Sequence, residues 1–228
     1  MRKVLLFLVG FGILATAIGF GVWNSRAGQD WLLERALTAA MKRPATFGQY
    51  DGLRVFLCGT SSPLPDPARA QACVAIFAGD SLYLVDAGAG SAQVATLAQL
   101  PLERLEAVFL THFHSDHIAA LPEFNLNSWV AGRPEPLSVF GPSGVSEVVD
   151  GLNAAYRLDR AYRVAHHGDE LLPPDLGPMD ARLLDAGSVL ELGELVITSF
   201  AVDHDPVRPA VGYRFDYRGR SVVISGDA

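Results

Sequence analysis

The chain is poor in lysine and in cysteine. Of its 228 residues, only two are lysine, Lys3 and Lys42, and only two are cysteine. Two cysteines are too few for a disulfide-dense scaffold or for a cysteine-rich zinc module. Because 50% of the residues are hydrophobic and 19% are charged, a disordered chain is also excluded. The length suits one substantial domain, or one domain with an appendage.

Positive charge is scarce in the main part of the chain. From Asp51 onward there are 12 arginines and no lysine, against 23 aspartates and glutamates. A surface with that balance repels polyanions such as nucleic acids. We therefore expect a small-molecule substrate, such as an ester, rather than a nucleic-acid partner.

A long apolar run lies at the start of the sequence. Arg2 and Lys3 precede an uncharged stretch at residues 4–23, and about 20 apolar residues in a helix span the hydrocarbon core of a bilayer. We expect a membrane anchor. A cleaved signal peptide is the alternative, because small residues at 15–17 and 25–27 resemble cleavage sites. The short basic N-terminus favours an orientation in which the rest of the chain lies outside the cytoplasm, in the periplasm or outside the cell.

Apolar runs separated by glycine and proline predict a layered α/β chain with mixed sheets. Strands are expected at residues 53–58, 73–77, 82–85, 107–110, 137–140, 195–202, 210–217 and 221–225. Helices are expected at residues 29–43, 91–100, 116–127 and 144–156. His166 and His167 are expected in a loop, as surface residues, as substrate contacts or as substitute metal ligands.

Three of the six histidines fall within six positions that follow an expected strand. His112 and His114 are two residues apart, so in an extended segment they point to the same side. Asp116 and His117 stand where the next helix begins and can turn back toward the same space. Four side chains of these types suit a borderline-soft divalent cation.

The pattern His-x-His-x-Asp-His at residues 112–117 resembles the signature of the metallo-β-lactamase fold hydrolases. Asp86-Ala87-Gly88-Ala89-Gly90 resembles the first motif of that family, His204 the third, and Ser225-Gly226-Asp227 the fourth. Residues 59–63 and 212–215 are similar to the ribonuclease Z and arylsulfatase branch. The resemblance covers about residues 53–228 and implies a metallo-β-lactamase αββα sandwich with mixed sheets.

The resemblance also implies two divalent metal ions, most often zinc, that share a bridging water. Carried over to this sequence, one ion would be held by three histidines and the second by Asp116 and His117, with Asp227 between them. The three histidines are His112, His114 and His204. Asp116 would also be catalytic, as the proton acceptor from that water. Asp86 would position the histidine segment through hydrogen bonds, or would only form a turn.

The domains expected are a membrane anchor or signal segment at 1–25, a juxtamembrane helical stalk at 26–50 and the hydrolase domain at 51–228. The last ligand of the family is a histidine beyond the fourth motif, whereas this sequence stops at Ala228. We therefore expect a fragment that lacks the C-terminal part of the sandwich. Cys58 and Cys73 are expected to form a disulfide if the domain is exported, or to remain two buried thiols.

The favoured function is a binuclear zinc hydrolase that cleaves a small sulfate or phosphate ester. One alternative is a tRNA 3′-processing endonuclease of the ribonuclease Z type, against which the negative charge and the apolar first segment argue. A second alternative is a membrane-tethered metal-binding protein without catalysis. Lactone or thioester cleavage is a third.

Overall fold

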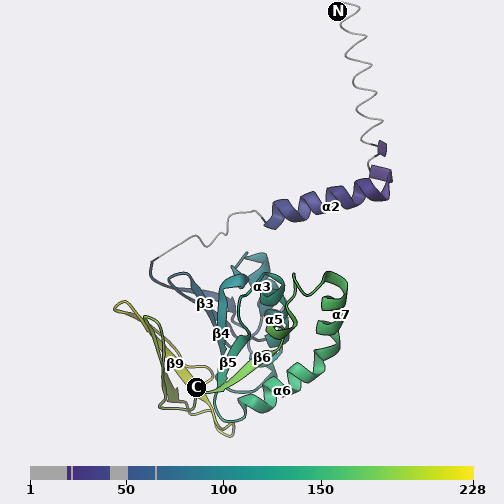
Figure 1. Cartoon of the computed structure of the whole chain (residues 1–228). Coiled ribbons are helices and arrows are strands. Elements are labelled where there is room, and N and C mark those ends of the chain that lie inside the picture. The colour runs from purple at the N-terminus through teal and green to yellow at the C-terminus, as the bar shows by residue number, and fades with distance from the viewer. Residues whose placement is uncertain (1–19, 22, 42–50, 65) are drawn as a thin grey trace, which may run out of the picture. The chain divides into compact units, whose positions relative to one another are not determined.

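The computed structural model describes the chain except for residues 1–19, 22, 42–50 and 65, and it divides into two units, residues 1–44 and 45–228 (Figure 1). The first unit contains helix α2 (Arg26–Met41), where the sequence predicts a helix. Most of the apolar run at residues 4–23 lies outside the described residues, so the anchor stays a prediction. None of the helices within the described ranges is long and apolar enough to cross a membrane.

The second unit begins with a six-stranded mixed sheet in the order β1 to β6. Three strands form antiparallel pairs: β1 (Leu53–Gly59), β2 (Cys73–Ala78) and β3 (Ser81–Val85). Three more continue the sheet in parallel: β4 (Leu105–Phe109), β5 (Leu137–Gly141) and β6 (Met179–Leu183). Parallel neighbours need long crossover connections. The crossovers here contain α3 (Ser91–Leu97), η1 (Leu102–Arg104), α4 (Ser115–Ile118), α5 (Leu121–Val130), α6 (Val145–Ala155), α7 (Arg157–His167) and η2 (Pro174–Leu176).

A four-stranded antiparallel sheet packs against the first one. Its strands are β7 (Val189–Leu192), β8 (Leu195–Ala201), β9 (Val211–Tyr217) and β10 (Arg220–Ile224), in the order β10-β9-β8-β7. Along β8, Leu195, Ile197 and Ser199 are buried while the residues between them are partly exposed. This alternation is typical of a strand with one face on a core.

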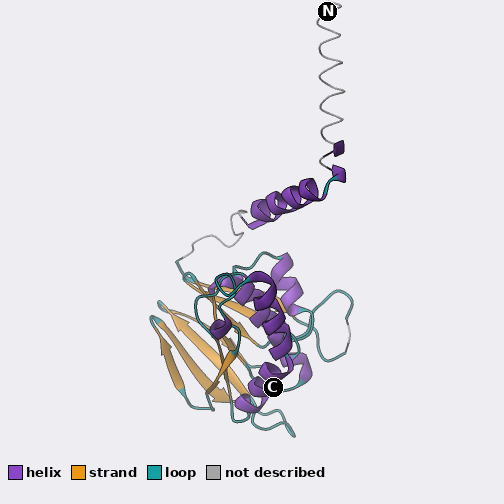
Figure 2. Cartoon of the chain, turned by 45° about the vertical axis from the view of Figure 1, so that its right-hand side comes forward, coloured by secondary structure: helices purple, strands orange, loops and turns teal. Residues whose placement is uncertain are grey.

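Two hydrophobic cores define the layers. One lies between the first sheet and its helices, and the other lies between the two sheets. In the second core, the Phe109 ring stacks on Phe140 and meets Tyr213 and Phe215 edge-on. Helices cover one side of the first sheet and the second sheet covers the other (Figures 1 and 2).

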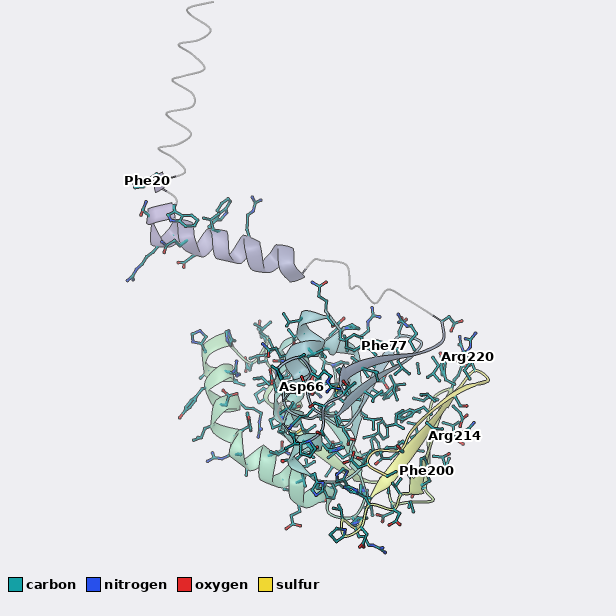
Figure 3. All side chains as sticks on the ribbon, turned by 180° about the vertical axis from the view of Figure 1, so that it is seen from behind. Phe20, Asp66, Phe77, Phe200, Arg214 and Arg220 are labelled. Carbon is teal, nitrogen blue, oxygen red and sulfur yellow. A yellow bond between two sulfur atoms is a disulfide. The ribbon has the colours of Figure 1, made fainter. Side chains whose placement is uncertain are left out.

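The described elements of this unit therefore make three layers, αββ. The fourth, helical layer of the predicted αββα sandwich is not among them. Phe200 and Arg214 lie on the second sheet, seen from behind in Figure 3. Arg214 forms an ion pair with Asp216 on the same strand.

The structure corrects three details of the predicted elements. Residues 157–167 form helix α7, so His166 and His167 are helical and the predicted loop is wrong. Good helix formers, among them three arginines and two alanines, explain that helix. Strands β6 and β7 are additional. The single helix expected at 116–127 is divided into two helices, α4 and α5. The division occurs because the Ala120 N–H donates to the Ala87 carbonyl instead of to a carbonyl within the helix.

Candidate metal centre

The histidine segment leaves the carboxyl end of β4, in the middle of the first sheet. His114 is extended and precedes α4, so Asp116 and His117 fall on the first turn of that helix. His112, Asp116 and His117 are all buried. The expected arrangement of a strand, a ligand-rich segment and a helix is therefore confirmed.

Five of the six predicted ligands form two groups whose ligand atoms all lie within 4.8 Å of one another. The first group is His112, His114 and His204, and the second is His112, His117 and Asp227. His112 Nε2 lies 3.0 Å from His114 Nδ1, and the His112 and His204 ring centroids are 4.9 Å apart. The sequence assigned His112 to one ion, whereas the geometry places it in both groups.

Asp116 lies beside the second group without being part of it. Its Oδ2 is 3.6 Å from His117 Nε2, and the Oδ1 of Asp227 is 3.4 Å from the same nitrogen. Asp227 reaches this place because Gly226 adopts a positive φ of 65° and packs against Thr111, where a Cβ would lie 2.8 Å from the threonine Cβ. The structure therefore brings all six predicted residues together.

Asp86 fixes the orientation of this segment from the end of β3. It has a positive φ of 60°, which is uncommon for a residue other than glycine and turns its carboxylate toward the ligand segment. That carboxylate accepts the Thr111 N–H at 2.8 Å, the Thr111 hydroxyl at 2.9 Å and His117 Nδ1 at 2.8 Å. A His117 that donates from Nδ1 keeps Nε2 available as a ligand. The positioning role expected for Asp86 fits these contacts.

Burial dominates the electrostatics of the cluster. It raises the pKa of the Asp86 carboxyl and, together with neighbouring His117, lowers the pKa of His112 to about 4. Burial alone would lower the pKa of His117, but the hydrogen bond to Asp86 and the surrounding carboxylates raise it. His112 is therefore neutral near pH 7, as a metal ligand must be.

The donor set fits divalent metal ions. His204 Nε2 is buried and makes no hydrogen bond within the described part of the chain, and a buried polar atom without a partner is costly. Imidazole nitrogens in two groups that share a member, with carboxylates beside them, match the ligand preferences of zinc and of manganese or iron.

Two further residues hold the segment, and the sequence analysis missed both. The Thr111 hydroxyl contacts Asp86 and also His112 Nδ1 at 3.1 Å. The buried Tyr213 donates its hydroxyl to the Leu110 carbonyl at 2.7 Å, across the two sheets. The position of Thr111 directly before His112 is a local signal. The contact between Tyr213 and Leu110 joins residues that are 103 positions apart, so no local sequence signal could have predicted it.

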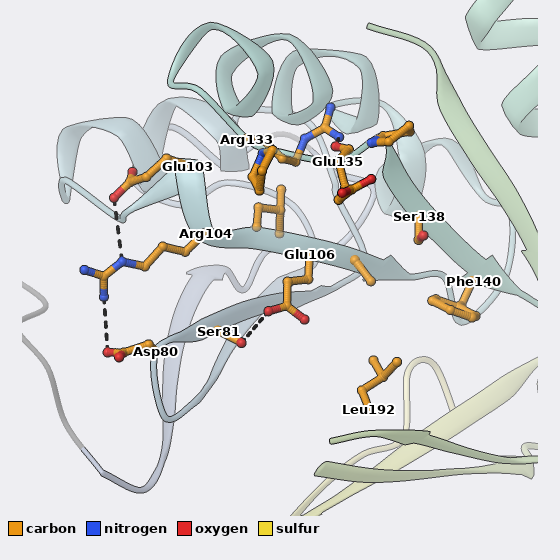
Figure 4. Close-up of a pocket in the computed structure, with 14 residues that line it drawn as sticks. Asp80, Ser81, Glu103, Arg104, Glu106, Arg133, Glu135, Ser138, Phe140 and Leu192 are labelled. Atoms are coloured by element: carbon orange, nitrogen blue, oxygen red, sulfur yellow. Dashed lines mark hydrogen bonds and ion pairs between the residues drawn. The ribbon is translucent and has the colours of Figure 1, made fainter. Parts of the chain in front are cut away.

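A cavity of about 620 Å³ lies away from these ligands, where β4 and β5 begin (Figure 4). Arg104 sits on its wall between Asp80 and Glu103, and Glu106 accepts the Ser81 hydroxyl. Since β4 leads to the histidines at its other end, this cavity is not part of the metal centre.

The remaining residues considered from the sequence lie elsewhere. His166 and His167 are exposed on α7, and neither belongs to a ligand group found among the described residues. Cys58 and Cys73 form a disulfide bond, with both residues buried. Of the two alternatives for the cysteines, the structure has the disulfide.

Comparison with known proteins identifies the family. Residues 66–228 match the family model of the metallo-beta-lactamase superfamily. The chain belongs to that superfamily. This confirms the resemblance seen in the His112–His117 motif.

Curated relatives narrow the branch, and solved structures share the fold. Ribonuclease Z of Mycobacterium marinum is 40% identical over 178 residues, covering 77% of this chain and 63% of that protein. Ribonuclease Z of Mycobacterium bovis is 41% identical, covering 77% and 62%. Human tRNase Z, short form, shares the fold with a TM-score of 0.59 and 22% identity, over 76% of this chain and 69% of that one. The protein YhfI from Bacillus subtilis has the same TM-score at 20% identity, over 78% and 64%.

These relatives overturn the predicted partners. A small-molecule ester substrate without nucleic acid conflicts with relatives that are named as ribonucleases. The error came from treating net charge as if it were evenly spread. Helix α7 carries three arginines and two histidines against one aspartate. The chain spans a little under two thirds of the length of the two mycobacterial ribonuclease Z relatives.

Proposed function

We propose that this chain is a metal-dependent hydrolase that cleaves phosphodiester bonds in RNA, the activity that the name of its ribonuclease Z relatives indicates. The observation that carries the proposal is the convergence of two ligand groups on His112, at the carboxyl end of β4. The relatives at about 40% identity favour RNA over a sulfate or phosphate monoester.

The residues divide into ligands and groups that support them. His112, His114 and His204 would hold one ion, and His117 with Asp116 would hold the other, while Asp227 lies between the groups. When bound, two such ions lower the pKa of a water molecule and neutralise charge on phosphate oxygens. Asp86 holds His117 through Nδ1 and so presents Nε2 to the site.

Asp116 is the proposed proton acceptor. Its buried carboxylate lies beside His117, with Oδ2 at 3.6 Å from His117 Nε2. A carboxylate beside the attacking water can take its proton while the phosphodiester bond breaks. The buried surroundings strengthen each of these interactions by excluding bulk water.

A cavity of about 670 Å³ opens where β8 ends and β9 begins, lined by Val202, Asp203 and Arg208 among others. Arg208 is paired with Asp205 at this cavity, whereas helix α7 carries three arginines on another part of the domain and is the better source of positive charge. Local positive charge of this kind is what binds a phosphate backbone.

The test compares two histidine variants for bound metal and RNA cleavage. His112→Ala removes a proposed ligand of the first ion that also lies in the second group, so it should lose at least one ion by elemental analysis and abolish cleavage of a precursor tRNA. His167→Ala, an exposed histidine on α7, is the matched control and should keep both ions. Cleavage of an aryl sulfate with no cleavage of RNA would reject the proposal.

We also propose that residues 1–25 anchor the protein or direct its export, that residues 26–50 form a stalk, and that residues 51–228 act outside the cytoplasm. The uncharged run at 4–23 supports this. The Cys58–Cys73 disulfide supports it as well, since disulfides persist in oxidising compartments. Cell fractionation with thiol labelling of the full chain tests both parts.

A further inference from the structure

The Cys58–Cys73 disulfide closes the segment at residues 59–72 beside the metal centre. Cys58 lies at the end of β1, where the register with β2 is irregular, and Cys73 is the first residue of β2. Their Cα atoms are 5.0 Å apart and both side chains are buried. The crosslink therefore fixes where the end of this segment runs.

The end of the segment is bonded to the loop that follows β3. The Gln71 N–H donates to the Ala89 carbonyl at 3.0 Å, and the Gln71 side-chain oxygen accepts the Ala89 N–H at 3.2 Å. The Gly88 N–H donates to the Ala72 carbonyl at 2.8 Å. Ala72 is the neighbour of Cys73, so these contacts begin one residue from the disulfide.

That loop in turn touches the residues proposed to hold the second ion. A Cβ on Gly88 would collide with the Asp116 carbonyl oxygen and would lie 2.7 Å from the Ala72 nitrogen. Gly88 is thus enclosed between the crosslinked segment and α4. The Ala87 N–H donates to the His117 carbonyl at 2.7 Å.

The first ligand group is anchored from a different direction. The Val211 N–H donates to the Thr111 carbonyl at 2.9 Å, and the Tyr213 hydroxyl donates to the Leu110 carbonyl. Both donors belong to β9, in the second sheet. His112, which both groups share, is thus positioned from β9, whereas Asp116 and His117 of the second site also contact the loop at Gly88 and Ala87.

We propose that the disulfide is a redox-sensitive positioning element for the second metal site, acting through Gly88 on Asp116 and His117. The inference rests on the metal centre of the proposed function. In the reduction step, a dithiol gives two electrons and two protons to the Cys58–Cys73 bond. The S–S bond breaks, two cysteine thiols form, and the dithiol closes to a cyclic disulfide. Release of residues 59–72 then weakens the second site and spares the first.

The test titrates zinc into the metal-stripped full-length chain. The double variant Cys58→Ala/Cys73→Ala should bind the first ion as the wild type does and the second about 10- to 100-fold more weakly, the range typical for groups that orient a ligand. Val149→Ala, a buried change on α6, is the control for a general loss of stability, and it should weaken neither ion selectively. Melting curves of both variants verify that they fold.

A second preparation avoids dependence on the folding of the variant. Folded wild-type protein is reduced with dithiothreitol, its thiols are blocked and counted by mass, and zinc is titrated after desalting. Selective weakening of the second ion in both preparations supports the proposal. Unchanged affinity for both ions, or an equal loss of both in either preparation, overturns it. Wild-type protein that binds fewer than two ions would instead reject the metal centre of the proposed function.

Discussion

Replacing Asp86 by asparagine should lower the metal affinity of the site while the domain still folds, so this variant tests the positioning role of the carboxylate. The carboxylate has one oxygen toward the Thr111 N–H and the other toward His117 Nδ1. An asparagine keeps the first interaction through its carbonyl oxygen but places an amide where His117 donates. Burial raises the pKa of Asp86, so a neutral side chain of the same shape avoids the cost of a buried charge. We therefore expect the variant to fold.

The expected loss is that of one hydrogen bond to a charged group, about 1.5–3 kcal/mol. Because about 1.4 kcal/mol corresponds to a factor of ten, the ion next to His117 should bind roughly 10- to 100-fold more weakly. Zinc titration by calorimetry measures this directly.

The matched control for that measurement is Asp185→Asn. Asp185 also accepts a backbone N–H, from Ser143 at 2.8 Å, but it contacts none of the proposed ligands. Its replacement should leave both zinc affinities unchanged. Wild-type affinity in Asp86→Asn, with the protein folded, would refute the positioning role of this carboxylate.

Three further changes test other parts of the site. Tyr213→Phe leaves the buried Leu110 carbonyl without its donor and should cost about 1–3 kcal/mol, measured as a lower midpoint of denaturant unfolding; an unchanged midpoint contradicts the contact. Gly226→Ala imposes strain at a positive φ and a clash with Thr111, so zinc titration should show loss of the second ion first, and full retention of that ion would be the opposing result. Arg157→Glu on α7 should raise the KM for RNA several-fold at low salt with kcat unchanged, and the effect should fade as salt is added; a fall in kcat alone would argue against a binding role.

The sequence predicted most of the strands because each is a short apolar run between turn residues. The hairpin of β2 and β3 is an example, since two such runs flank the turn at Gly79 and Asp80. Helix α7 was missed because it is polar on average and buries no residue, although Leu158, Ala161 and Ala165 recur at helical spacing. Propensity, rather than a buried stripe, makes that helix, and propensity is a weak signal.

How well each ligand could be predicted depends on how far apart the ligands lie in the sequence. His112, His114, Asp116 and His117 lie within six residues, so local geometry alone brings them together. His204 and Asp227 come from the second sheet, and only the family resemblance pointed to them. The sharing of His112 between two groups depends on how the sheets pack, which no local pattern records.

The packing of the two sheets therefore decides the geometry of the metal centre. Phe109 is the last residue of β4, three positions before His112, and its ring is fixed by Phe140 at 5.0 Å and by Phe215 at 5.3 Å. The neighbouring Tyr213 ring continues this cluster and bonds the chain at Leu110. Interiors packed at crystal-like density shift little. The same aromatic cluster that joins the sheets thus sets the separation between ligands of the first sheet and ligands of the second.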